Sequence, residues 1–384
     1  MRGTTTALAV LWIMLATTVC SQTTVNPDIS AVGDFRTYAH NDKARDDERK
    51  TINLSNPDFE LNIGGYVNPY VRADVIVGWH GEHNAEIEEL YATILRGLPL
   101  GTNLRVGKYL LEFGRLNPVH PHAYSYIHRP LPHQLFFGEE GLSDMSLRAS
   151  WLLPTGDTYT ELMAGLLKGD ALMGHDHEHE ESASEHEEDE DVRHDLGFFG
   201  RLTTSVPLST AAELSLGASA TNAVYEVGHH EHDTTTDLEP KQMRAWLIGG
   251  DLKYKYRPSK YTALQIETEV ILRRAEQMTG NDLTSLGAYG YVDYRFHQKY
   301  NLGAIVEFVR DKHGEEIEVD GESMFSTFEH DTWRAGLFAG FAPIEETSLV
   351  RLAGHWTNPD DGDGFWETTL QLVVGLGPHK PHNF

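Results

Sequence analysis

The stretch from Met243 to Ala275 alternates between apolar and polar residues, and this pattern limits what the chain can fold into. Around a turn at 257–260, one parity is apolar or aromatic and the other is polar or charged. A period of two indicates strands, because successive side chains of a strand point to opposite faces. The apolar parity comprises Trp246, Ile248, Leu252, Tyr254, Tyr256, Leu264, Ile266, Val270 and Leu272, and the polar parity comprises Asp251, Lys253, Lys255, Arg257, Gln265, Glu267, Glu269 and Arg273.

These two runs are long enough to cross a membrane. A tilted membrane-spanning strand needs roughly 9–11 residues, whereas strands of soluble sheets usually have about 5–6. Trp246 and Tyr254 lie eight positions apart on the apolar side, which is about 26 Å along a strand, or about 20 Å of height when the strand is tilted, and this is near the ~25 Å lipid band that aromatic girdles flank. We therefore expect the apolar face to contact lipid and the charged face to line a wet lumen.

Similar runs continue from Phe59 onward, and the connections between them alternate between long, such as 114–142 and 313–330, and short. Tight turns on one side and long loops on the other are typical of an up-and-down barrel with both termini in the periplasm. We therefore predict an all-β fold, a transmembrane antiparallel β-barrel of about 14 strands with long extracellular loops and short periplasmic turns. The expected strands are 59–77, 86–97, 101–113, 143–154, 158–168, 195–206, 211–227, 243–257, 260–275, 286–298, 300–312, 331–343, 347–357 and 364–377.

The N-terminal part carries a different signal. Arg2 followed by the short apolar stretch 7–16 is typical of a secretory signal. The single cysteine, Cys20, lies within this signal, so we expect no disulfide in the mature chain. The expected division is a signal peptide at 1–21, a flexible periplasmic lead-in at 22–57 and the barrel at 58–384.

The C-terminal residue Phe384 resembles the aromatic end that barrel-assembly machinery recognises. Pro378 and Pro381 interrupt the last stretch, and proline cannot donate to a strand ladder. We therefore expect the final paired strand to end near Gly377.

The chain has a formal net charge of −27. This charge argues against nucleic acid as a partner and fits a surface that meets cations, although acidic loops also simply keep a protein solvated. Charged side chains on the inward parity are expected to line the pore, and their mixed signs specify no ion selectivity. These pore-lining candidates are Arg105, Arg148, Arg201, Lys253, Lys255, Glu267, Glu269, Asp293, Arg295, Glu307, Arg334 and Arg351.

Two expected loops are rich in metal-binding side chains. The segment from Gly174 to Asp195 holds five histidines and eleven carboxylates, and the next long loop, 228–242, holds three histidines. Imidazole and carboxylate suit zinc and similar divalent ions. One interpretation is capture of such ions at the barrel mouth, with no cofactor required, and the other is an acidic loop that binds metal only incidentally. The candidate metal ligands are His175, His177, His179, His186, His194, His229, His230 and His232.

The segment from Gly114 to Leu142 differs, because it holds four prolines, four histidines and several aromatic residues. Such a segment is too apolar and stiff for a disordered loop, so we expect it to fold and pack. Two placements are open: it bends into the lumen as a constriction, or it lies on the outer rim and braces neighbouring loops. Its histidines are expected to be structural hydrogen-bonding groups rather than metal ligands, and they are His120, His122, His128 and His133.

Several short motifs in the first part of the chain resemble a known family. They are Asn26-Pro27-Asp28-Ile29-Ser30, Gly33-Asp34-Phe35, Phe113-Gly114-Arg115-Leu116-Asn117, His120-Pro121-His122 and Phe137-Gly138-Glu139-Glu140-Gly141-Leu142. With these motifs the chain resembles Gram-negative outer-membrane barrel proteins that are similar to phosphate-selective porins of the O/P type and are sometimes labelled zinc-regulated outer-membrane receptors. The resemblance is best over residues 26 to about 155. It implies a bacterial outer-membrane channel tied to metal supply, and it transfers no catalytic residues.

Four classes of function follow for comparison. The leading one is a non-enzymatic outer-membrane channel for small solutes or ions, in contact with outer-membrane lipid and with a mouth that captures divalent cations. The alternative is a plug-less outer-membrane metal receptor. An energised receptor has a 22-stranded barrel with a plugged lumen, and neither the expected strand count nor the short lead-in supports such a barrel here. A membrane barrel enzyme is less favoured, because the chain has no Gly-x-Ser-x-Gly or His-Glu-x-x-His motif. A soluble periplasmic zinc chaperone conflicts with the strand lengths, and the oligomeric state is not specified.

Overall fold

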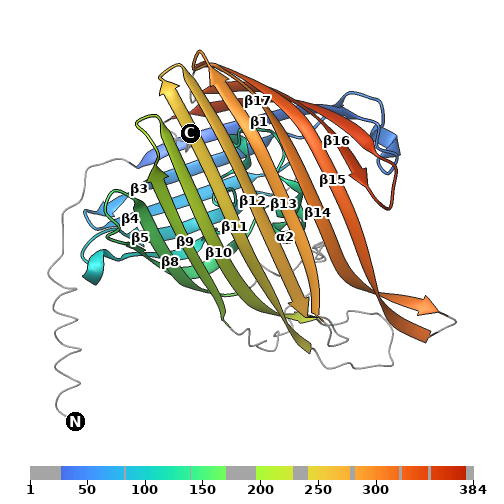
Figure 1. The fold of residues 1–384 in the computed structure, drawn as a ribbon, viewed down its shortest axis with the longest axis horizontal. Coiled ribbons are helices and arrows are strands. Elements are labelled where there is room, and N and C mark those ends of the chain that lie inside the picture. Colours follow the sequence, from blue (N-terminus) through green and yellow to red (C-terminus); the bar gives the residue numbers. More distant parts are fainter. Residues whose placement is uncertain are drawn as a thin grey trace, which may run out of the picture.

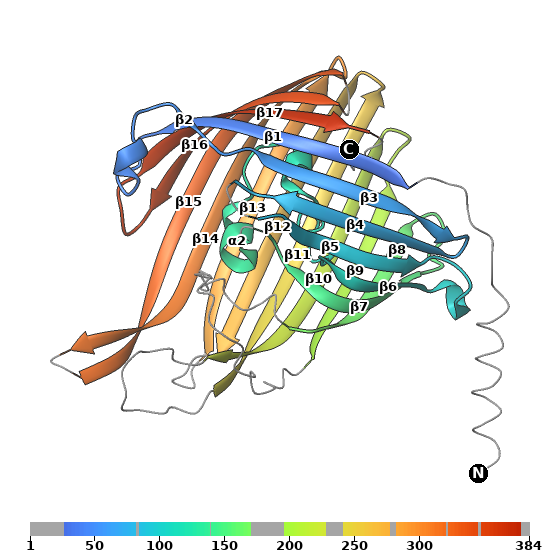
Figure 2. The same cartoon turned by 180° about the vertical axis from the view of Figure 1, so that it is seen from behind.

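The computed structural model describes residues 27–81, 84–138, 140–169, 196–227, 241–276, 282–319, 322–344 and 347–377. Within these ranges the chain forms one antiparallel sheet that closes on itself, because β1 (Asp28–His40) pairs with β17 (Phe365–Leu376). Figures 1 and 2 show the resulting barrel from opposite sides, with the long tilted strands β11–β15 on one side and the shorter β3–β7 on the other. The expected signal peptide and Phe384 lie outside the described residues.

Of the seventeen strands, sixteen form the barrel wall, and the two-residue β2 (Asn53–Leu54) pairs with β1 in the connection to β3. Short 3-10 helices occupy Asp46–Glu48, Pro99–Gly101 and Pro121–Ala123, and α2 is Leu131–Phe137. The remaining strands are β3 (Asp58–Asn68), β4 (Val71–Trp79), β5 (Glu86–Ile94), β6 (Asn103–Leu110), β7 (Ser143–Leu152), β8 (Tyr159–Leu167), β9 (Gly197–Pro207), β10 (Ala212–Val227), β11 (Lys241–Ser259), β12 (Thr262–Glu276), β13 (Asp282–Phe296), β14 (Tyr300–Val319), β15 (Glu322–Ile344) and β16 (Ser348–Pro359).

The antiparallel barrel is confirmed, but the prediction of about 14 strands is wrong, because the wall has sixteen. One extra strand comes from the expected strand 59–77, which is in fact the hairpin β3–β4. The side chain of Asn68 accepts hydrogen bonds from the backbone N–H groups of Tyr70 at 2.8 Å and Val71 at 3.0 Å. An asparagine that bonds the backbone two residues ahead makes a turn, so the chain reverses here.

The other extra strand is β1, which closes the barrel. Its inward residues Ser30 and Asp34 are buried, while Ile29 and Phe35 are about half exposed on the outward face. The outward positions between these two hold only alanine and glycine, so the apolar parity is weak in the sequence. The barrel therefore begins at Asp28 rather than at residue 58, and the expectation of a flexible lead-in is wrong for this strand.

The alternation along the predicted hairpin 243–275 is confirmed by the burial of its side chains. Trp246, Ile248 and Val270 are 44–54% exposed on the outward face, whereas Asp251 and Glu269 are 6% and 1% exposed. An exposed apolar face around a polar interior is the arrangement of a wall that faces lipid. Among the described residues, no helix is long and apolar enough to cross a membrane.

The two ends of the barrel differ, as the connections predict. The turn end, which also holds the first residue of β1 and the last of β17, has the connections 69–70, 153–158, 208–211, 260–261 and 297–299. At the opposite loop end, β14 and β15 stay paired as far as Val319 and Glu322 and extend beyond the other strands (Figures 1 and 2). The expected long loop at 313–330 is therefore mostly strand. The expected end near Gly377 is confirmed, since β17 ends at Leu376.

Candidate functional site in the lumen

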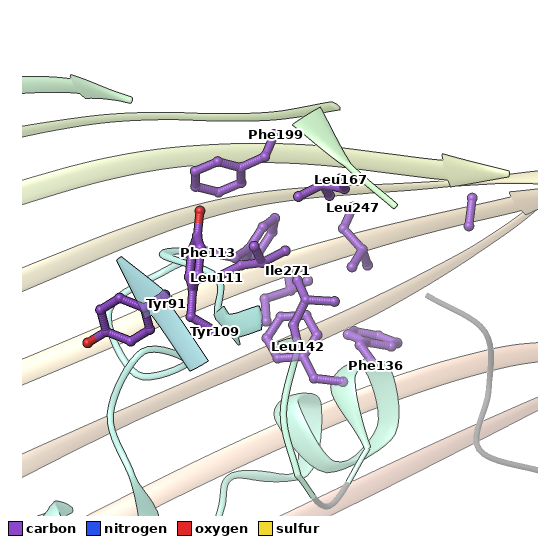
Figure 3. Packing of buried hydrophobic residues seen from close by; sticks show 12 residues of the cluster. Tyr91, Tyr109, Leu111, Phe113, Phe136, Leu142, Leu167, Phe199, Leu247 and Ile271 are labelled. Carbon is purple, nitrogen blue, oxygen red and sulfur yellow. The ribbon is translucent and has the colours of Figure 1, made fainter. Parts of the chain in front are cut away.

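The described residues of 111–142, between β6 and β7, lie inside the barrel, and we call this segment the lumen loop. Of the two placements that the sequence leaves open, the structure shows the bend into the lumen. Leu111, Phe113 and Leu142 pack against the inward side chains of Leu247 on β11 and Ile271 on β12, as Figure 3 shows. All five are 1% exposed or less, so the wall and the lumen loop share one apolar core.

Asn117 closes the neck of the lumen loop, where the chain enters and leaves. Its Nδ2 donates to the carbonyls of Leu111 at 2.8 Å and Leu142 at 2.9 Å, and its Oδ1 accepts from the N–H of Leu142 at 2.9 Å. The N–H of Leu111 also donates to the carbonyl of Leu142 at 2.9 Å. Gly114 follows with a φ of 62°, and an added Cβ would lie 1.7 Å from Glu269 Oε1, so only glycine fits this position.

Glu307 of β14 anchors the start of α2. Its Oε2 accepts a hydrogen bond from the N–H of Leu131 at 2.6 Å, which satisfies one of the free N–H groups at the helix N-terminus. The same carboxylate forms a buried ion pair with Arg334 of β15 at 2.7 Å. Arg334 also donates to the carbonyl of Arg129 at 2.9 Å, so one ion pair of the wall holds two backbone groups of the lumen loop.

Arg351 of β16 holds the middle of the lumen loop. Its guanidinium donates to the backbone carbonyls of His122 at 2.5 Å, of Tyr126 at 2.6 Å, and of Tyr124. The side chain is 1% exposed, so these carbonyls take the place of water around a buried cation.

Wall carboxylates hold the opposite flank. Asp251 of β11 pairs with Arg115 of the lumen loop at 2.9 Å and with Arg201 of β9 at 2.8 Å. Glu269 of β12 lies 3.2 Å from the Nε2 of His133. Several inward charges of the wall therefore hold the lumen loop in place.

The predicted pore-lining residues occupy inward positions, and most of them are buried. Four of the twelve border the largest lumen cavity: Arg105, Lys253, Glu267 and Arg295. Lys255 borders a smaller pocket together with Arg295. Eight are 7% exposed or less: Arg148, Arg201, Glu267, Glu269, Asp293, Glu307, Arg334 and Arg351. Their role in lining a pore stays a prediction.

A cavity of about 600 Å³ remains between the lumen loop and the wall formed by β3–β6 and β11–β13. This volume lies within the range of about 300–1,000 Å³ that small-molecule sites occupy. Its lining carries both signs, for example Glu89 and Glu112 beside Arg72 and Arg105. The space can hold a small polar solute, and its lining offers both hydrogen-bond donors and acceptors.

The four histidines of the lumen loop make polar contacts with the wall, and whether they are structural groups or metal ligands stays a prediction. His128 Nε2 lies 3.0 Å from Thr369 Oγ1, and His120 is surrounded by Glu60, Glu88 and Glu89.

The surroundings of His120 and His128 shift the pKa values of these two histidines in opposite directions. Burial alone would lower the pKa of His120, but the three glutamates outweigh it and hold this pKa well above its ordinary value. Burial, reinforced by the nearby His355 and Arg334, holds the pKa of His128 well below its ordinary value.

Three groups of histidine and acidic side chains have possible ligand atoms within 4.8 Å of one another in the described part of the chain. They are Glu60, Glu88 and His120; His128, His355 and Glu367; and His330, Asp360 and Asp361. Sequence reasoning misses them because each joins distant segments. The predicted ligands His175, His177, His179, His186, His194, His229, His230 and His232 all lie outside the described residues.

Known proteins with a similar sequence or fold were compared with this chain. No family model matches the chain. An uncharacterized protein of Aquifex aeolicus (strain VF5) is 28% identical over 331 residues, which are 78% of this chain and 67% of that protein. The anion-selective porin of Comamonas acidovorans superimposes with a TM-score of 0.56 at 7% identity, covering 91% of this chain and 99% of the porin. The chain has the fold of outer-membrane porins.

Two further solved structures agree with this porin fold. The loop L8 deletion mutant of OmpT from Vibrio cholerae gives a TM-score of 0.55 at 10% identity and covers 91% of this chain and 99% of its own. The outer membrane channel DcaP of Acinetobacter baumannii gives a TM-score of 0.51 at 11% identity, with coverages of 93% and 99%. At these identities the likeness concerns the fold, and it does not single out phosphate-selective porins or zinc-regulated receptors.

Proposed function

We propose that the protein is a bacterial outer-membrane channel through which small polar solutes pass beside the lumen loop. The observation that carries this proposal is the closed sixteen-stranded wall with an apolar outer face around a charged cavity of about 600 Å³. Porins of 16–18 strands enclose an aqueous channel. The anion-selective porin and the channel DcaP, whose barrels resemble this one, support the same role.

The alternative of an energised metal receptor loses support from the strand number. Such receptors have 22-stranded barrels with a plugged lumen, whereas this wall has sixteen strands and its lumen is narrowed by a loop of the wall itself. We therefore keep the passive channel as the proposal.

Electrical recording in planar lipid bilayers tests the channel. The purified full-length protein should add discrete steps of ionic current, because water and ions can follow the charged cavity. Heat-denatured protein is the control and should add none. A preparation that is folded, as shown by heat-modifiable migration on detergent gels, but electrically silent would contradict the proposal.

We further propose that the segments 174–195 and 228–242 concentrate divalent cations such as zinc near the channel mouth. The support is their composition, with eight histidines among many carboxylates. A local excess of one charge raises the encounter rate of ions of the opposite sign.

Calorimetry tests this cation capture. Deleting residues 174–195 should lower the number of zinc ions bound per chain, because five imidazoles and eleven carboxylates are removed. A matched variant with these five histidines changed to asparagine keeps the acidic charge, so it separates ligation by imidazole from attraction to the acids. Unchanged zinc binding in both variants would remove the proposal.

A further inference from the structure

A bulge in β5 points two consecutive glutamates at one imidazole of the lumen loop. The register of β4 against β5 shifts between Ile76 and Val77, which leaves Glu88 as the extra residue. Glu88 Oε2 lies 3.3 Å from His120 Nδ1, and Glu89 Oε1 lies 2.8 Å from His120 Nε2. A regular strand would send one of two neighbouring side chains outward, so the bulge creates this pair.

Glu60 of β3 completes a group of three residues with Glu88 and His120, whose possible ligand atoms all lie within 4.8 Å of one another, and His122 of the lumen loop lies beside Glu60. Glu60 Oε2 lies 3.0 Å from His120 Nδ1 and 3.4 Å from His122 Nδ1. With bonds of about 2.0–2.2 Å, a tetrahedral zinc ion spaces its ligand atoms about 3.3–3.6 Å apart. The separations of 3.0 and 3.3 Å from His120 Nδ1 to Glu60 and Glu88 are close to this spacing.

Hydrogen bonding alone explains these contacts less well. Charge-assisted bonds between nitrogen and carboxylate oxygen are usually about 2.7–2.9 Å long. His120 Nδ1 carries at most one proton, yet it faces two carboxylates at 3.0 and 3.3 Å. A shared cation satisfies both oxygens and the Nδ1 atom of His120 at once.

Two outer groups orient the donors in the way that metal sites require. Glu89 holds His120 Nε2, which leaves Nδ1 directed at Glu60 and Glu88. His80 Nε2 lies 2.7 Å from the other oxygen of Glu88. Residue 78 is glycine, and a Cβ there would lie 1.8 Å from Glu88 Oε1, so this position is kept open for the carboxylate.

The group is reachable from the lumen. Glu60, His120 and His122 all border the cavity of about 600 Å³. Their side chains are 13%, 15% and 9% exposed, so an ion that enters the cavity can reach them and is then mostly enclosed.

We propose that Glu60, Glu88 and His120 bind one divalent transition-metal ion of the Zn²⁺ class, with Glu89 and His80 as positioning residues and His122 beside the site. The ion ties the lumen loop to β3 and β5. This site uses no residue of the histidine-rich segments 174–195 and 228–242, and it does not depend on the proposed channel function.

Anomalous diffraction at the zinc edge, from crystals of the full-length protein grown with zinc chloride, tests the position of the ion. A peak within bonding distance of His120 Nδ1 and Glu60 Oε2 is expected. Zinc peaks elsewhere with none at this group would overturn the proposal.

Calorimetric zinc titration of the full-length protein tests the ligands. Glu60→Gln and His120→Asn should each lower the affinity for one zinc ion per chain at least tenfold. Glu89→Gln should lower the affinity for the same ion by about 10–100-fold, because His120 loses the partner that orients it. His297→Asn at the turn end is the matched control, and changing the five histidines of 174–195 to asparagine should leave the affinity for this ion unchanged. Wild-type titrations from both Glu60→Gln and Glu88→Gln, each folded by heat-modifiable migration, would sink the site without affecting the channel proposal.

Discussion

At the scale of single residues, the lumen loop is held mainly by side chains that bond its backbone. Asn117, Glu307 and Arg351 together pair N–H and carbonyl groups at the neck, at the start of α2 and in the middle of the segment. Buried backbone groups must be paired with something. These three side chains supply the partners that a strand ladder would otherwise provide, so an irregular segment is stable inside the barrel.

The substitution Asn117→Ala tests whether side-chain bonds to the backbone hold the neck of the lumen loop closed. The change leaves the N–H of Leu142 and two carbonyls without their partner, so opening of the neck should become easier by on the order of 2 kcal/mol. Hydrogen exchange of the amides of Leu111 and Leu142, followed by mass spectrometry in detergent, should quicken by about 30-fold.

The strands that lack contact with the neck, such as β16, should exchange as in the wild type. Asn103→Ala, at the turn end of β6, is the matched control and should leave the neck amides unchanged. Equal exchange in Asn117→Ala and wild type would mean that the backbone bond between Leu111 and Leu142 holds the neck alone.

At the scale of elements, alternation predicts the strands well where the two faces meet different surroundings. The runs from 143 onward correspond one by one to β7–β17, because their outward residues face lipid and their inward ones are polar. Alternation fails to predict β1, whose outward face is partly alanine and glycine. It also fails to separate β3 from β4, because the turn between them is made by one asparagine side chain.

The position of the lumen loop can be recognised in the sequence from the inward residues of neighbouring strands taken together. The alternation pattern of each single strand does not show it. Inward positions of a wet lumen should be polar, yet Leu247 and Ile271 are apolar. Gly249 and Gly287 are also inward, and an added Cβ would lie 2.7 Å from Phe113 and 2.6 Å from Pro132 respectively. Apolar and small residues at neighbouring inward positions of β11–β13 thus mark the part of the wall that the lumen loop covers.

The candidate metal group could not be predicted in the same way. Its donors come from β3, β5 and the lumen loop, and a single-residue bulge decides that both Glu88 and Glu89 point inward. Register shifts of this kind depend on pairing with the neighbouring strand, which one strand's sequence does not specify. Composition, by contrast, directs attention to the histidine-rich segments, which lie outside the described residues.

At the scale of the whole molecule, the wall and the lumen loop have separate roles. The sixteen-stranded wall provides the apolar exterior and the enclosed space, and the lumen loop fills part of that space and leaves a cavity of about 600 Å³. We therefore expect the lumen loop and the charged residues that line this cavity to determine which solutes pass, more than the width of the barrel does.

The most direct test of this account is the single-channel conductance of a variant without the lumen loop. Residues 115–140 are replaced by a glycine-serine turn of about four residues, which suffices because Leu111 and Leu142 are already hydrogen-bonded at 2.9 Å. The conductance of this variant should be several-fold above that of the wild type, since a barrel of this strand number is wide once emptied. A folded variant with the conductance of the wild type would show that the lumen loop does not lie in the path of ions.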